Sequence, residues 1–93
     1  MNINLDELPV LHVPENRRFE IRVEGLVAEL TYSLAGGTIT FLHTGVPAEL
    51  EGQGVGKKLA MAGLEYARSN GLKIQSLCWF VTIHLKRHPE YQS

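Results

Sequence analysis

Glycines alternate with other residues at Gly52, Gly54 and Gly56, directly ahead of Lys57 and Lys58 and of a helical pattern. Glycines leave backbone N–H groups uncovered, and a helix N-terminus carries partial positive charge, so this stretch predicts a seat for an anion, most often a phosphate. A lysine in the first helical turn is unfavourable for the helix itself, and a bound anion would offset that cost. The alternative is a plain strand-to-helix turn, but the glycine spacing and the two lysines favour a ligand.

The second candidate for chemistry is the single cysteine, Cys78, which follows a short apolar segment. A thiolate is a nucleophile, whereas a lone cysteine after a strand is most often a small buried side chain, so both interpretations stay open. One cysteine excludes an internal disulfide. No metal site is expected, because the histidines are scattered and none has zinc-ligand spacing with Cys78. They are His12, His43, His84 and His88, of which the last two are interpreted as surface or packing groups.

The first half of the chain must supply a sheet. Apolar and charged residues alternate strictly from Arg18 to Glu24, and a second alternation runs from Ala28 to Leu34. A period of two is typical of half-buried strands. Turn signals at Glu24-Gly25 and Ala35-Gly36-Gly37 join these strands to a third over 38–44. With a short strand at 10–13, this pattern predicts an antiparallel meander.

The period then changes to that of a helix, which is predicted over 53–69. Its apolar stripe is interpreted as core and comprises Gly56, Leu59, Ala60, Gly63, Leu64 and Ala67. Asn70-Gly71 ends this helix, a strand follows over 72–77, and a second helix over 80–86 ends at His88-Pro89. The predicted fold class is therefore α+β, an antiparallel β-meander followed by a β-α-β-α unit.

Length and composition limit the function classes. Ninety-three residues with 44% apolar content predict a single domain at 10–93, preceded by a polar, flexible lead-in at 1–9. A net charge of −1 argues against nucleic acid as a partner. We expect no membrane segment, since no apolar run could span a bilayer, and a cytoplasmic location, which suits a single reduced cysteine.

Two common phosphate-binding motifs are excluded by counting. A P-loop requires a glycine at position 51 and a serine or threonine at position 58, where this chain has Glu51 and Lys58. The dinucleotide fingerprint requires two residues between its last two glycines, but Gly54 and Gly56 are separated by one. The remaining pattern, x-x-Gly-x-Gly at a helix start after a meander, resembles the GNAT superfamily of acetyl-CoA-dependent N-acetyltransferases.

The resemblance is sharper to the short, single-domain members of that superfamily and covers nearly the whole chain from Arg18 onward. Leu77 and Trp79, on either side of Cys78, are larger than the residues that these members have there, and their bulk would narrow the acceptor side of the site. The matching landmarks keep their order and are Arg18-Phe19-Glu20, Gly25, Ala28-Glu29-Leu30-Thr31-Tyr32, His43-Thr44-Gly45-Val46-Pro47, Gly54-Val55-Gly56, Cys78 and His88-Pro89-Glu90-Tyr91.

The resemblance implies a truncated GNAT-like fold, with acetyl-CoA or coenzyme A as the cofactor and an amine as the acetyl acceptor. It implies that the strand before the glycines splays from its neighbour, that the Val46 N–H is the donor to the acetyl carbonyl, and that Cys78 lies near the thioester. Cys78 would then either accept the acetyl group or protonate the leaving thiol. The cofactor-binding residues implied are His43, Thr44, Val46, Gly52, Gln53, Gly54, Val55, Gly56 and Lys57.

Partners and rival functions are less constrained. An open acceptor groove would suit a lysine or N-terminus of a protein or peptide, and we expect a monomer or weak dimer. Glu51 stands where the superfamily has Arg or Gln, which should weaken binding of a pyrophosphate. The alternatives are therefore a non-catalytic coenzyme A-binding module, or an interaction module that docks through Trp79, Phe80 and Ile83.

Overall fold

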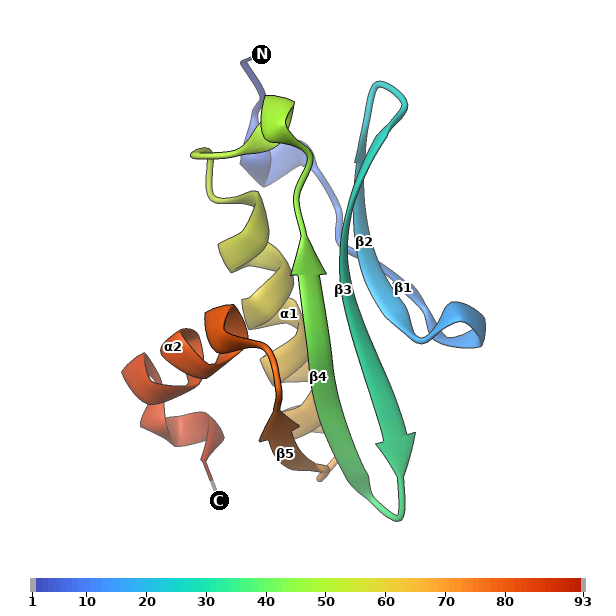
Figure 1. The fold of residues 1–93 in the computed structure, drawn as a ribbon, viewed down its shortest axis with the longest axis vertical. Helices are drawn as coiled ribbons and strands as arrows, with labels where there is room; N and C mark the ends of the chain where they lie inside the picture. Colours follow the sequence, from blue (N-terminus) through green and yellow to red (C-terminus); the bar gives the residue numbers. More distant parts are fainter. Residues whose placement is uncertain (1, 93) are drawn as a thin grey trace.

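The computed structural model describes residues 2–92, so that the outermost residues of the expected lead-in and domain, 1 and 93, lie outside the described part. It forms a five-stranded sheet in the order β1-β2-β3-β4-β5, with two helices (Figure 1). The strands are β1 (Leu11–Val13), β2 (Arg18–Val23), β3 (Leu26–Ala35), β4 (Thr38–Gly45) and β5 (Lys73–Ser76). The helices are α1 (Val55–Ser69) and α2 (Trp79–Arg87), and short 3₁₀ turns lie at η1 (Leu5–Glu7), η2 (Pro14–Asn16), η3 (Ala48–Leu50) and η4 (Pro89–Tyr91).

The antiparallel meander is confirmed for β1 to β4, and β5 pairs with β4 in parallel after the α1 crossover. The two predicted hairpin turns depend on backbone that twists with the strands. Glu24 and Gly25 have φ of 48° and 83°, and Gly36 and Gly37 have φ of 59° and 79°. Two successive positive φ values are the mark of a type I′ turn, which joins twisted strands with two residues.

Helix α1 packs across one face of the sheet through the predicted stripe, which is buried together with Val55. The closest approach is at Gly63. A Cβ atom there would lie 2.8 Å from Cε1 of Phe41 and 2.9 Å from Cδ2 of Leu30. Since both side chains are fully buried, neither has free space to move into. Gly63 therefore sets how closely α1 lies on β3 and β4.

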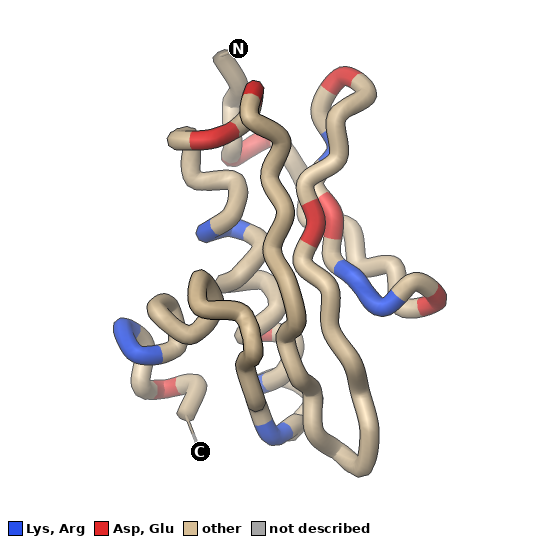
Figure 2. Tube along the Cα trace, in the orientation of Figure 1, with Lys and Arg blue, Asp and Glu red and all other residues tan. Residues whose placement is uncertain are grey.

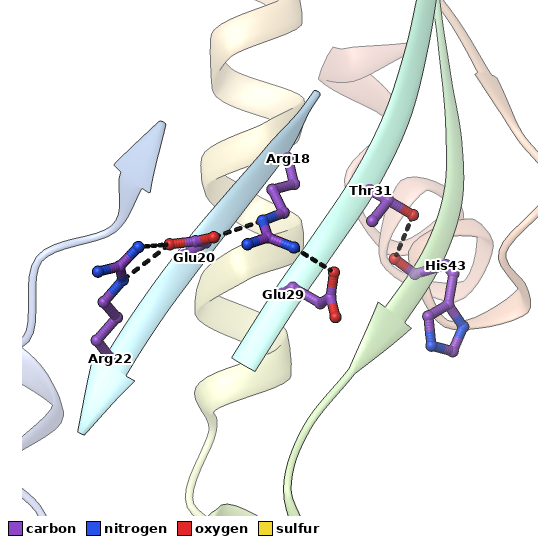
Figure 3. Close-up of polar contacts among 6 residues, drawn as sticks. All are labelled: Arg18, Glu20, Arg22, Glu29, Thr31 and His43. Atoms are coloured by element: carbon purple, nitrogen blue, oxygen red, sulfur yellow. Dashed lines mark hydrogen bonds and ion pairs between the residues drawn. The ribbon is translucent and has the colours of Figure 1, made fainter. Parts of the chain in front are cut away.

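The other face of the sheet carries an ion-pair cluster (Figure 3). Glu20 is fully buried there, although its neighbours in sequence point into the core on the opposite face. Arg22 binds it through Nε at 2.9 Å and Nη2 at 2.7 Å, Arg18 binds it from the other side, and Arg18 also lies 3.5 Å from Glu29. The hydrogen bond from Arg22, helped by Arg18, outweighs burial and holds the pKa of Glu20 below its usual range.

Strands β4 and β5 separate partway along their length. They pair only from Thr38 to Phe41, and the last bond between them is from Leu77 N–H to Phe41 O at 2.8 Å. Beyond it β4 continues beside β3 as far as Gly45, whereas β5 ends. A bulge at Leu42 shifts the register of β4 at this point, since Phe41 faces Tyr32 but His43 faces Thr31. The separation opens a space between the end of β4 and the start of α2.

The segment expected as a lead-in packs against the domain. Ile3, Leu5 and Leu8 are partly buried against the core, and η1 lies beside the start of α1. Within residues 2–92 no helix is long and apolar enough to cross a bilayer. The same residues hold no group of three or more histidine, cysteine or acidic side chains arranged to bind a metal ion.

Replacing Gly63 with valine should destabilise the fold. The added side chain would overpack Phe41 and Leu30 at a cost of about 1–3 kcal/mol, which exceeds the few tenths of a kcal/mol that valine adds in helix propensity over glycine. We expect a fall in the melting temperature of roughly 5 to 20 °C, measured by circular dichroism. An unchanged or higher melting temperature would show that α1 does not lie this close to the sheet.

Replacing Glu20 with glutamine should cost about 1–3 kcal/mol, because it removes the carboxylate that Arg18 and Arg22 share. Glu29→Gln is the matched control on the facing strand, and its loss should stay under about 1 kcal/mol, since Glu29 is partly exposed.

The pH dependence follows from the lowered pKa of Glu20. Its stabilisation is present above the ordinary glutamate pKa of about 4.3 and is lost as the pH falls through the lowered pKa. Urea unfolding between about pH 2.5 and 6 should therefore show a weaker acid dependence in Glu20→Gln than in the wild-type chain. Equal slopes would contradict this assignment.

Candidate functional site

The space opened where β4 and β5 separate is a cleft of about 880 Å³. Its walls come from the end of β4, the turn before α1, the first turn of α1, and the near side of α2. The residues that line it are Leu42, His43, Thr44, Gly45, Val46, Leu50, Glu51, Gly52, Gly54, Val55, Gly56, Lys57, Leu77, Cys78, Trp79, Phe80, His84 and Arg87. Sequence reasoning placed the anion seat and the thiol on the same cleft, and the structure brings them together.

The backbone amides around the start of α1, at residues 52–57, have no hydrogen-bond acceptor within the described chain. Among residues 2–92, no hydrogen bond leads from the backbone N–H of any residue from 52 to 57, and the first helical bond runs from Lys58 N–H to Gly54 O at 3.0 Å. Gly54 is the N-cap, and no side chain caps the helix. Gly52 and Gly54 have φ of 77° and 85°, values that glycine adopts without strain. A run of unpaired donors at a helix N-terminus can bind an anion.

The two lysines after the glycines have different roles. Lys57 is exposed and lines the cleft. Lys58 turns away and donates to the carbonyl oxygens of Leu5 and Leu8, which ties the N-terminal segment to α1. The expectation that Lys58 adds positive charge to the anion seat was therefore wrong, because its ammonium is used in a structural contact.

Gln53 is the predicted site residue that does not line the cleft. Its side-chain amide lies 3.4 Å from Glu49 O, so it closes the turn rather than the site. His43 lines the cleft, and its exposed side chain lies over Gly45, beside the stem of Glu29. Figure 3 shows the ring projecting from β4, with the carbonyl of the same residue accepting a bond from Thr31.

Cys78 faces β4 across the cleft. It is buried, with 8% of its surface exposed, and its sulfur lies 3.4 Å from Oγ1 of Thr44. The backbone at this position is firmly held, because the Cys78 carbonyl accepts bonds from Ser76 Oγ at 2.8 Å and from Thr82 Oγ1 and N–H, both at 3.0 Å. The thiol therefore has a fixed place opposite the end of β4.

The surroundings of Cys78 favour the thiolate. Burial raises the pKa of the thiol, but the hydrogen bond with Thr44 and the nearby amides of Val81, Phe80 and Thr44 together lower the pKa below its ordinary value. Cys78 is the N-cap residue of α2, where the amides of Phe80 and Val81 lower the pKa of its thiol although its side chain forms no capping hydrogen bond. A thiol at a helix N-terminus with a lowered pKa is the usual environment of a reactive cysteine.

Helix α2 supplies residues that sequence reasoning missed. Phe80 packs on the start of α1, with its ring 3.1 Å from where a Cβ of Gly56 would be. His84 packs edge-on against Phe80 with ring centroids 4.8 Å apart and is buried, with 6% exposed, so of its two interpretations, surface or packing group, the second is confirmed. Arg87 lies one turn further along. The spacing of positions 80, 84 and 87 on one helix face after Cys78 could have indicated this wall.

The outer rim of the cleft is apolar and exposed. Leu42 comes from the bulge of β4, and Leu77 and Trp79 flank Cys78 with 76% and 73% of their surface exposed. The docking surface considered for Trp79, Phe80 and Ile83 is not continuous, because Phe80 turns inward against α1 while Trp79 faces solvent.

Known proteins are similar to this chain in sequence and in fold. A family model described as GCN5-related N-acetyl-transferase matches residues 18–93. Protein NATD1 of Mus musculus is 35% identical over 83 residues, covering 86% of this chain and 76% of its own, and NATD1 of Danio rerio is 34% identical over 89 residues, covering 90% and 81%.

A solved structure supports the same family assignment. The solution structure of a GCN5-like protein from Staphylococcus aureus superposes with a TM-score of 0.68 at 40% identity, covering 94% of this chain and 86% of that one. The truncated GNAT-like fold expected from the sequence is thereby confirmed. The chain belongs to the GCN5-related N-acetyltransferase (GNAT) family.

Proposed function

We propose that this protein binds acetyl-CoA in the cleft between β4 and α2 and transfers the acetyl group to an amine by way of Cys78. The observation that carries the proposal is the juxtaposition of unpaired amides at residues 52–57 with a thiol held against β4. Membership of the family supports the reaction class.

The residues present fit the cofactor at both ends. A diphosphate carries negative charge and acceptor oxygens, which match the free amides and positive dipole at the start of α1. Glu51 opposes this on charge, but it is exposed and solvent screens it, whereas Lys57 is also at the seat. The opposite end of the cleft ends at the sulfur of Cys78 and the apolar rim.

The reaction needs a nucleophile, a hydrogen-bond donor to the oxyanion and an acceptor for the acetyl group. A thioester supplies an acetyl group activated for transfer. The Cys78 thiolate is the nucleophile, and the contacts with Thr44 and the α2 amides lower the pKa of the thiol, which increases its ionised fraction. We assign the N–H of Val46 as the donor to the developing oxyanion, because Val46 lies beyond the last β3 pairing and lines the cleft. Coenzyme A would leave as its thiolate when the acetyl group moves to Cys78. An amine would then attack the acetyl carbon, so that a C–N bond forms, the C–S bond to Cys78 breaks, and the proton lost by the amine ends on the departing coenzyme A thiolate.

The acceptor we propose is a lysine or N-terminal amine of a protein or peptide. The cleft mouth is open, and Leu42, Leu77 and Trp79 at its rim are exposed rather than covered by other elements of the described chain. A small metabolite is usually bound in a concave pocket that buries most of its surface. An extended or flexible peptide can rest its apolar side chains on the rim while its amine reaches the sulfur.

A negative charge introduced among the amides of residues 52–57 should weaken cofactor binding. Gly52 has φ of 77°, nothing lies within 4 Å of where its Cβ would be, and both Asp and Asn tolerate this backbone region. Gly52→Asp should reduce acetyl-CoA affinity about tenfold or more relative to Gly52→Asn, the neutral match. Isothermal titration calorimetry measures both. Equal affinities, or no saturable binding to the wild-type chain, would contradict the seat.

Cys78 should carry the acetyl group. After incubation with labelled acetyl-CoA, peptide mass spectrometry should find the label on Cys78, and Cys78→Ala should lower amine acetylation about 100-fold or more. Thr44→Val removes a contact that lowers the thiol pKa, so its labelling rate should rise at higher pH than that of the wild type. If cofactor binds but neither Cys78 nor an added amine is labelled, the protein is a non-catalytic coenzyme A-binding module.

A further inference from the structure

Two basic side chains and one buried imidazole line the cleft beside the start of α1 and along α2. Lys57 lies in the first turn of α1, and His84 and Arg87 lie three residues apart on α2, so that all three line the same cleft. Figure 2 shows basic segments at the start of α1 and at the end of α2 on the same side of the molecule. At a rise of about 1.5 Å per residue, Arg87 is about 12 Å along α2 from its first residue, which is next to Cys78.

This charge has no partner in the described chain. Among residues 2–92, the ion pairs join arginines to Glu20 and Glu29 on the sheet, and His88 to Glu90, and none includes Lys57 or Arg87. The 93 residues carry a net charge of −1, so an unpaired cationic group is not a result of general basicity. Of the residues that the structure describes, Glu51 is the only acidic one that lines the cleft.

His84 adds an independent sign of a missing partner. It is more than nine-tenths buried, lines the cleft, and its Nδ1 is buried without a hydrogen-bond partner among residues 2–92. Burial, and then the charges of Arg87, Lys57 and His88, lower the pKa of its imidazole. A buried ring nitrogen without a partner is costly, and the cationic neighbours disfavour a protonated ring. An anion at this point would accept a hydrogen bond from Nδ1 and would offset the positive charge of Lys57 and Arg87.

We propose that Lys57, His84 and Arg87 form a second phosphate subsite, which binds the 3′-phosphate of coenzyme A. This inference rests on the proposed function, in which the amides of residues 52–57 already bind the diphosphate. With the thioester at Cys78 and the diphosphate at the start of α1, the nucleotide half of the cofactor lies toward the free end of α2. A phosphomonoester is close to a dianion at neutral pH, and a guanidinium binds it in a bidentate manner.

The test compares coenzyme A with 3′-dephospho-coenzyme A, which differ in this one phosphate. By calorimetry the wild-type chain should bind coenzyme A at least about tenfold more tightly. Arg87→Gln should weaken coenzyme A binding severalfold and leave dephospho-coenzyme A nearly unchanged. Lys57→Gln should weaken binding of both nucleotides, and of coenzyme A more, because Lys57 also lies at the diphosphate seat. Lys86→Gln is the matched control, because this exposed neighbour on α2 does not line the cleft. Melting curves without ligand check that the variants are folded.

Each outcome decides the matter. Equal binding of the two nucleotides by the wild-type chain overturns the subsite and leaves the proposed function standing. Equal weakening of both nucleotides in Arg87→Gln would also overturn it, because Arg87 would then contact the diphosphate. If neither nucleotide binds, the proposed function fails and the subsite fails with it.

Discussion

The separation of β4 from β5 is the constraint on which the site depends. The two strands share one short parallel ladder that ends at the bond from Leu77 N–H to Phe41 O. Had pairing continued, the end of β4 would be covered by β5, and Cys78 could not face Thr44 across open space. The bulge at Leu42 redirects β4 at the same level, and α2 begins where the ladder stops. One local change of pairing therefore produces the cleft, the place of the thiol and the exposed rim.

Close packing holds the other wall of the cleft. Gly63 allows α1 to lie on Phe41 and Leu30, and Gly56 allows the ring of Phe80 to press against the first turn. The start of α1 is thereby fixed relative to both β4 and α2, while its amides stay free. Charged side chains are paired on the sheet but not in the cleft. The sheet face away from α1 pairs its own charges around Glu20, whereas the cleft keeps Lys57 and Arg87 unpaired within residues 2–92.

Local chemistry made most of the fold predictable. Strict alternation in β2 and β3, paired positive-φ turns, and the stripe on α1 each depend on neighbours in sequence, and each was correctly interpreted. The strand boundaries agreed to within one or two residues, and the 3₁₀ turns were missed because they have no periodicity.

The site was less predictable because it depends on contacts between distant segments. The glycine turn and Cys78 could be found by residue type, but the use of Lys58 by Leu5 and Leu8, and the burial of His84, follow from how the N-terminus and α2 pack. The central claim, that the free amides before α1 bind a diphosphate and direct a thioester to Cys78, is tested most directly by an NMR titration of the ¹⁵N-labelled chain with coenzyme A. The account predicts that the largest shifts fall on the amides of residues 52–57, with further shifts at Thr44 to Val46 and at Cys78. Shifts confined to another surface, or none at saturating ligand, would contradict it.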